Sequence, residues 1–230
     1  MEFLKFDINK CVLCGVCVEK CPFGALTIEG NGIVVGDACR MCGLCVRNCP
    51  EKAIRFEQKA KSFDKDKWKN FLIYVEQERG EIHPVTFELI GEARKLADDL
   101  GQNVVAVLLG NQIKDKASEL IAHGADKVVV VDDEMLAEYV TEPYAKAMME
   151  IIQSHNPEIV LYGATSIGRD LAPRVSARIH TGLTADCTKL DIDEETKLLM
   201  MTRPAFGGNI MATIVCEDFR PQMATVRPRS

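Results

Sequence analysis

The chain has 230 residues, 47% of them hydrophobic, which is enough for a small module plus one ordinary domain of about 150 residues. Its formal net charge of -6 argues against nucleic acid as the main partner. No apolar stretch is long enough for a membrane span, and the opening MEFLKFDINK lacks the apolar region of a secretion signal, so we expect a cytoplasmic chain with no membrane span.

Eight of the ten cysteines form two copies of one spacing near the N-terminus. Each copy has the pattern C-x-x-C-x-x-C-x-x-x-C-P, which is typical of bacterial ferredoxins with two 4Fe-4S clusters. In this pattern the fourth cysteine of each run ligates the cluster of the other run, because it is held too far along the chain to reach the cluster of its own run. We therefore predict two 4Fe-4S clusters, one held by Cys11, Cys14, Cys17 and Cys49 and the other by Cys39, Cys42, Cys45 and Cys21.

Disulfides and zinc are the alternatives for these cysteines. Disulfide scaffolds are typical of small secreted proteins, and this chain has no secretion signal. Zinc sites take four ligands in two pairs, whereas each run here supplies three close cysteines and a distant one. The spacing therefore favours iron-sulfur chemistry.

The two cysteine runs belong to an internal repeat with an offset of 28 residues, in which Ala25 matches Ala53 and Leu26 matches Ile54. Such a repeat predicts a pseudo-symmetric unit over residues 1–57, with short strands at about 2–8, 26–29, 33–35 and 53–57. A unit of this size has little apolar core, so we expect metal bonds to hold it together.

Residues 58–70 interrupt the pattern with five lysines and little apolar periodicity, which predicts a linker. We interpret it as a solvated connector in preference to a docking patch for an acidic partner. Trp68, the only tryptophan, is expected to attach the end of this linker to the following domain.

From residue 71 to 230 apolar strands alternate with amphipathic helices, which predicts an α/β domain with a mainly parallel sheet covered on both faces. Right-handed crossovers make it Rossmann-like. The predicted strands are 71–75, 104–109, 127–131 and 158–162, and the predicted helices are 84–100, 112–123, 143–154 and 169–180. Further strands at 184–193, 197–203, 209–216 and 222–227 are expected to extend the sheet and to include an antiparallel pair.

The loop at residues 163–170 is the best candidate for an anion site, because it follows a strand and opens a helix. It matches neither G-x-G-x-x-G nor the P-loop, so a tight turn without a ligand is the favoured interpretation. The four histidines are scattered singly and indicate no metal site.

Residues 71–228 resemble the first domain of the alpha subunit of electron transfer flavoproteins. The resemblance is carried, in chain order, by Pro84-Val-Thr-Phe-Glu-Leu89, Gly124-Ala-Asp-Lys-Val128, Gly168-Arg-Asp-Leu-Ala-Pro-Arg-Val-Ser-Ala-Arg178, Gly182-Leu-Thr-Ala-Asp-Cys187, Thr202-Arg-Pro-Ala-Phe-Gly-Gly-Asn209 and Arg220-Pro-Gln-Met-Ala-Thr-Val-Arg-Pro228. With its ferredoxin-like N-terminal part, the chain is similar to alpha subunits of electron-bifurcating complexes of the caffeyl-CoA reductase type.

This resemblance implies an electron-transfer subunit rather than a stand-alone enzyme. It implies a beta subunit whose flavin, FAD, takes a hydride from NADH and divides the two electrons. One electron would pass through the two clusters to external ferredoxin, and the other to an acyl-CoA dehydrogenase-like or other dehydrogenase partner. In this family the alpha subunit continues into a second domain that holds another FAD, whereas the sequence here ends at Ser230, so the motifs of that domain cannot be assigned.

Arg169 and Arg203 lie in two of the family-like segments, at predicted strand ends. A guanidinium at either position could stabilise a reduced, anionic flavin of the partner subunit, because it keeps its charge and donates in a fixed fork. The alternative is an ion pair. Two other functions remain open, namely a ferredoxin module fused to an adenylating or other nucleotide-binding domain, and a nucleotide-binding redox sensor.

Overall fold

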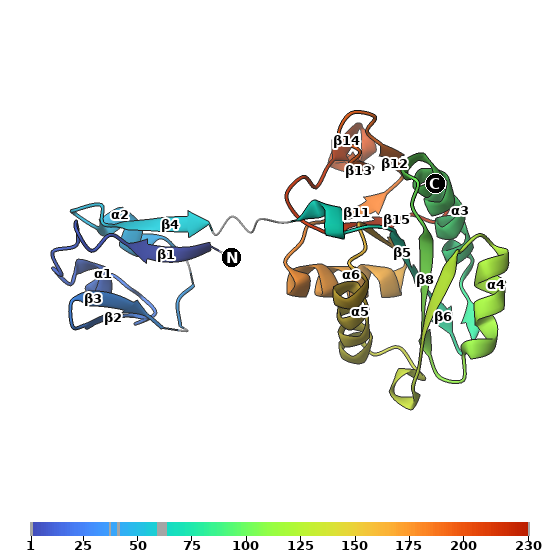
Figure 1. Ribbon diagram of the computed structural model, residues 1–230, viewed down its shortest axis with the longest axis horizontal. Coiled ribbons are helices and arrows are strands. Elements are labelled where there is room, and N and C mark those ends of the chain that lie inside the picture. The colour runs from blue at the N-terminus through green and yellow to red at the C-terminus, as the bar shows by residue number, and fades with distance from the viewer. Residues whose placement is uncertain (1, 37, 41, 59–63, 230) are drawn as a thin grey trace. The chain divides into compact units, whose positions relative to one another are not determined.

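The chain consists of two compact units, residues 1–62 and 63–230 (Figure 1). The computed structural model describes residues 2–36, 38–40, 42–58 and 64–229. Residues 59–63 of the predicted linker lie outside the described residues, so the linker stays a prediction. No helix among the described residues combines the length and the apolar character that crossing a membrane requires.

The first unit contains two copies of one strand–helix–strand motif. Its elements are β1 (Glu2–Phe6), α1 (Val16–Glu19), β2 (Leu26–Glu29), β3 (Gly32–Val35), α2 (Leu44–Asn48) and β4 (Ile54–Gln58). Strand β1 pairs antiparallel with β4, and β2 pairs antiparallel with β3. The small core contains matching residues from the two halves, because Leu26 and Ile54 are both buried and so are Cys17 and Cys45.

The second unit is built on a six-stranded, fully parallel sheet in the order β11-β15-β10-β5-β8-β9. The strands and helices up to the last crossover are β5 (Phe71–Val75), β6 (Gln77–Glu78), β7 (Glu81–Ile82), α3 (Pro84–Leu100), β8 (Val104–Gly110), α4 (Ala117–Ala122), β9 (Lys127–Asp132), α5 (Thr141–His155), β10 (Ile159–Gly163) and α6 (Ser166–Ile179). The remaining strands are β11 (Leu183–Cys187), β12 (Lys189–Ile192), β13 (Leu199–Ala205), β14 (Ile210–Ile214) and β15 (Gln222–Val226).

Helices cover both faces of this sheet, so its four central strands, β15, β10, β5 and β8, are buried on both sides. Alternate residues of β5 show the division, because Ile73 packs with the apolar residues of α3 and α4 whereas Tyr74 packs with those of α5 and α6. Figure 1 shows the same two layers on opposite sides of the sheet. Trp68 packs against the layer that contains α5 and α6, as expected of a residue that fixes the start of this unit. The predicted α/β, Rossmann-like fold class is confirmed.

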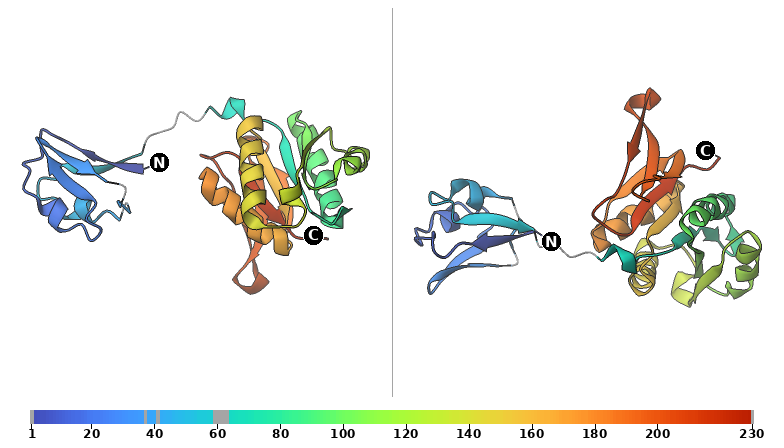
Figure 2. Two further views of the ribbon diagram at one scale, coloured as in Figure 1. Left: turned by 90° about the horizontal axis from the view of Figure 1, so that it is seen from below. Right: turned by 45° about the horizontal axis from the view of Figure 1, so that its top comes forward.

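The late strands differ from the prediction in one respect. The expected strand 184–193 is two strands, β11 in the parallel sheet and β12 in a separate antiparallel sheet with β13 and β14. The change occurs at Asp186, whose φ of 61° turns the chain out of register just before Cys187. Only β11 and β15 therefore extend the main sheet, and the hairpin β13–β14 projects from the unit in both views of Figure 2.

Two helices also begin at other residues than predicted. Helix α6 begins at Ser166 because the Thr165 side chain caps it by accepting the backbone N–H of Gly168 at 3.1 Å. Helix α4 begins only at Ala117, after a 3₁₀ turn over Lys114–Lys116. Both shifts lie at the helix N-terminus, where sequence patterns locate boundaries poorly.

Candidate functional site

Each cysteine run turns inward through a glycine in the left-handed backbone region. Gly15, with φ of 77°, follows Cys14 and opens α1, and Gly43, with φ of 73°, follows Cys42 and opens α2. A residue with a Cβ is strained in this conformation. The turn places the third cysteine of each run in the core, where Cys17 and Cys45 are both 7% exposed.

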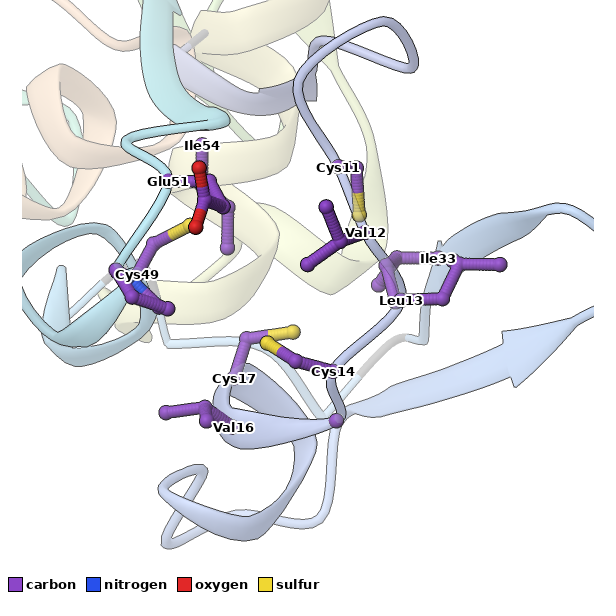
Figure 3. Close-up of a pocket in the computed structure, with 12 residues that line it drawn as sticks. Cys11, Val12, Leu13, Cys14, Val16, Cys17, Ile33, Cys49, Glu51 and Ile54 are labelled. Carbon is purple, nitrogen blue, oxygen red and sulfur yellow. The ribbon is translucent and has the colours of Figure 1, made fainter.

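The cysteines line two cavities, each with three thiols from one run and the last thiol from the other. We call the first cavity site 1; its cysteines are Cys11, Cys14, Cys17 and Cys49 (Figure 3). We call the second cavity site 2; its cysteines are Cys39, Cys42, Cys45 and Cys21. Much of the remaining wall is apolar, with Ile33 and Ile54 at site 1 and Leu4 and Leu26 at site 2. The structure thus brings together the two sets of four cysteines that the spacing predicts.

The last cysteine of each run, which lies in the site of the other run, accepts the same hydrogen bond in both sites. The backbone N–H of Ala25 donates to Cys21 Sγ at 3.4 Å, and that of Ala53 donates to Cys49 Sγ at 3.3 Å. Hydrogen bonds to cluster sulfurs stabilise their negative charge and raise the reduction potential. Because the two bonds are alike, they affect both sites equally.

The donor chemistry of both cavities fits iron-sulfur clusters, since four thiols face a mostly apolar space in each. Burial raises the pKa of the Cys17 and Cys45 thiols, so binding iron there must release protons. All ten cysteines are free of disulfides. A site for a single metal ion is a separate case. Within the described part of the chain, no group of three His, Cys, Asp or Glu side chains could hold one.

Another cavity lies in the second unit, at the switch point of the sheet between β5 and β10, where the strand order changes direction. Ligands of open α/β sheets bind at such a switch point, beyond the carboxyl ends of the strands. Glu76 follows β5 there, is 6% exposed and lines a cavity with His83 and Ile167. Burial raises the pKa of Glu76, while the Thr165 hydroxyl, which donates to Oε2 of Glu76, lowers it in part.

The loop 163–170 therefore has a negative partner inside the chain. Thr165 caps α6 and also donates to the Glu76 carboxylate, so the first polar contacts of this helix N-terminus are occupied by the protein. A second anion would have to approach a buried carboxylate, which Coulomb repulsion opposes. That the loop is a turn without a ligand stays a prediction.

The two arginines predicted to contact flavin differ in their surroundings. Nε of Arg169, in the first turn of α6, lies 3.0 Å from Oδ1 of Asp186 in an exposed ion pair. Arg203 lies within β13 opposite Ala212, not at a strand end, because β13 continues to Ala205. In the part of the chain that the structure describes, Arg203 forms no ion pair. Burial raises the pKa of Cys187 to about 11, and the charge of Arg203 opposes this rise.

Two charged residues at the cysteine cavities were not singled out from the sequence. Glu51 lines site 1, and Arg40 lines site 2. The internal repeat contains the signal that identifies them, because Arg40 aligns with Val12 and Glu51 aligns with Phe23. The two halves of the repeat thus supply the same number of cysteine ligands but different charged residues.

The second unit and the cysteine runs match different family models. The model described as electron transfer flavoprotein domain matches residues 71–230. Models described as 4Fe-4S binding domain match residues 4–27 and 36–52.

Curated relatives extend the match. The chain is 58% identical over 161 residues to an electron transfer flavoprotein subunit alpha of Thermoanaerobacterium thermosaccharolyticum, covering 70% of this chain and 48% of the relative. It is 49% identical over 210 residues to the lactate dehydrogenase (NAD(+),ferredoxin) subunit LctC of Acetobacterium woodii, covering 91% of this chain and 50% of the relative. An acryloyl-CoA reductase electron transfer subunit beta of Anaerotignum propionicum is 46% identical over 190 residues, which covers 73% of this chain and 52% of the relative. The chain spans about half the length of these relatives.

Proposed function

Because this chain belongs to the electron transfer flavoprotein family, we propose that it is the electron-transfer subunit of an oxidoreductase complex and holds two 4Fe-4S clusters. The observation that carries the proposal is the crossed arrangement of thiols, in which Cys49 joins the first run at site 1 and Cys21 joins the second run at site 2. A bound cluster would supply one-electron storage at each site. The protein supplies the thiols, excludes part of the water and fixes the spacing of the sites.

We further propose that the complex divides electron pairs. In this scheme FAD in an electron transfer flavoprotein beta subunit accepts a hydride from NADH, one electron leaves through sites 1 and 2 to external ferredoxin, and the other goes to an acyl-CoA dehydrogenase-like or other dehydrogenase. The name of the Acetobacterium relative, which includes NAD(+) and ferredoxin, supports this scheme, and its alignment covers 91% of this chain. The cytoplasm is the proposed location of the complex.

The switch point of the sheet argues against the adenylating alternative. An adenylating enzyme of this architecture needs a pyrophosphate loop after its first strand, but β5 is followed by Glu76 and the hairpin of β6 and β7. The buried Glu76 carboxylate would repel a pyrophosphate there. No observation in the second unit favours a nucleotide sensor over an electron-transfer subunit.

The cluster proposal is tested by iron analysis and by one substitution. After anaerobic reconstitution the chain should contain about eight irons, as eight thiolate ligands of two clusters require. A content near four would refute two clusters. In Cys21→Ser the spectroscopic signal of the site 2 cluster should be lost or altered while that of site 1 remains. If site 1 alone were damaged, the crossed assignment would be wrong.

The partners are tested by purification and by Arg203→Ala. Anaerobic purification should recover a flavoprotein beta subunit with the chain; recovery of none would oppose the complex. In the reconstituted complex, Arg203→Ala should lower the potential of the partner's flavin, because a guanidinium stabilises the reduced anion. Arg169→Ala is the comparison, since Arg169 is already paired with Asp186. Unchanged flavin potential and turnover in Arg203→Ala would eliminate the electronic role.

A further inference from the structure

The two cysteine sites are alike in the burial of their ligands and in the hydrogen bond to Cys21 or Cys49, and the charged residues described around them differ. Solvent exposure is equal pair by pair: Cys17 and Cys45 are buried, Cys14 and Cys42 are exposed, and the other four ligands are intermediate. The N–H bonds to Cys21 Sγ and Cys49 Sγ differ by only 0.1 Å, at 3.4 and 3.3 Å. Cluster type, sulfur hydrogen bonds, exposure and net charge are the main determinants of potential. Among the described residues of the cavity walls, charge is a property in which the two sites differ.

The charged residues of the cavity walls have opposite signs. Glu51 lines site 1, where Figure 3 draws it on the segment that also carries Cys49. The equivalent residue at site 2 is Phe23. Conversely Arg40 lines site 2, and its equivalent at site 1 is the apolar Val12. Both of these differences in the cavity walls make site 2 more positive than site 1.

A further pair of equivalent residues adds to the difference. Arg47 donates through Nη2 to the carbonyl oxygen of Cys42 at 3.3 Å, which brings its guanidinium next to a ligand of site 2. Its repeat equivalent is Glu19, which pairs with Lys20 at 3.6 Å in an exposed contact. Lys52 follows Glu51 but does not line site 1. Arg40 thus lines site 2 and Arg47 contacts the backbone of its ligand Cys42, whereas Glu51 lines site 1.

We propose that these different charged residues give the two sites unequal reduction potentials, so that a single electron added to the chain resides mainly at site 2. The proposal presumes that both sites hold clusters, as proposed above. Four thiolates give each site a negative charge that grows when an electron is added. Arg40 and Arg47 stabilise that added charge at site 2, and Glu51 destabilises it at site 1. A one-electron donor loses the electron that site 2 gains, and no bond forms or breaks.

All these side chains are exposed, so solvent screens their effect. We expect site 2 to hold the electron about tenfold more often than site 1, which for one electron corresponds to about 59 mV. High salt should shrink the difference, because the Debye length falls from about 10 Å at 0.1 M to about 3 Å at 1 M.

The test is a redox titration of the reconstituted 230-residue chain with dithionite, followed by electron paramagnetic resonance. The wild-type chain should give two midpoint potentials. Arg40→Val, which installs the residue found at position 12, should lower the higher potential and leave the lower one in place. Val12→Arg should raise the lower potential, and Val12 is 64% exposed, so the longer side chain has room. Arg40→Gln repeats the first test with a side chain of similar length.

The control is Arg55→Thr, which removes the same charge from the same unit at a residue that lines neither cavity and whose repeat equivalent is Thr27. The higher potential should fall less than in Arg40→Val. Two potentials that cannot be separated, or a lower potential that moves in Arg40→Val, would overturn the inference while leaving two clusters in place. An iron content near four would instead show that the proposed function itself is wrong.

Discussion

Glu76 illustrates how one buried carboxylate can organise the switch point of a sheet. It is 6% exposed and joins the end of β5 to the cap of α6, since its Oε2 accepts from Thr165. The same Thr165 oxygen accepts from the N–H of Gly168, so charge, cap and helix start form one chain of hydrogen bonds. Its backbone is held as well, because the N–H of Glu76 donates to Thr86 Oγ1 at 3.1 Å.

This environment predicts an unusual pH dependence for Glu76. Burial raises its pKa above 4.5, so the folded chain binds the proton more tightly than the unfolded chain does. The stability that this difference contributes is complete below about pH 4.5 and is lost as pH rises through the higher pKa of the folded state. Glu76→Gln cannot titrate, so its stability relative to wild type should increase over that pH range and then become constant. Urea unfolding, followed by the fluorescence of Trp68, measures the difference.

Glu78→Gln is the matched control, because Glu78 is an exposed carboxylate two residues along the same hairpin. This variant shows what the loss of one negative charge from the hairpin does by itself. A flat difference between Glu76→Gln and wild type across the pH range would show that the Glu76 carboxylate is not stabilised in its protonated form.

The ligand set could be predicted from the sequence and the Glu76 contact could not, for a physical reason. The cysteine spacing is local, and the crossing of the fourth ligand follows from the reach of a short loop. The contact between Glu76 and Thr165 joins residues separated by 89 positions, and only the parallel pairing of β5 with β10 brings them together. Nothing near either residue in the sequence indicates its partner.

At the scale of elements, helix α6 depends on the absence of a side chain at Gly168. A Cβ at this position would lie 1.8 Å from the carbonyl oxygen of Gly163, closer than atoms can approach. We expect Gly168→Ala to destabilise the second unit at the upper end of the range for overpacking, about 3 kcal/mol. The midpoint of urea unfolding should fall accordingly.

Gly91→Ala is the opposite case and serves as the control. Gly91 lies on the exposed side of α3, and a Cβ there meets no atom within 4 Å. Alanine in an exposed helix interior should stabilise the unit by about 0.5–1 kcal/mol. If both substitutions had the same sign, the contact of α6 with Gly163 would not govern the stability of this helix.

The type of an element could be predicted where a pattern of apolar residues extends over many residues. It was harder to predict where the chain changes direction. Strand β5 and helix α3 match their predicted ranges because a buried run and a helical repeat are strong signals. The split of the expected strand 184–193 was missed, since it depends on the left-handed conformation of Asp186 and on the bulge next to it. Neither feature has a clear sequence signal, because a residue other than glycine in this conformation is uncommon.

At the scale of the whole molecule, the two units differ in what stabilises them. Among the described residues, the hydrophobic cluster of the first unit has four buried members, and two of them are the cysteines Cys17 and Cys45. The second unit has two large apolar clusters, one on each face of its sheet. We therefore infer that metal bonds stabilise the first unit and that apolar burial stabilises the second.

This division predicts that removing iron unfolds one unit and spares the other. Trp68 is the only tryptophan and packs against the second unit, so its fluorescence reports that unit. When a chelator and an oxidant strip the clusters, circular dichroism should lose the signal of the first unit, because a unit of this size has too little core without metal. The urea midpoint of Trp68 should stay where it is in the cluster-loaded chain. Cys17→Ala together with Cys45→Ala should reproduce the result without chelator, and a lowered Trp68 midpoint in either experiment would show that the second unit draws stability from the first.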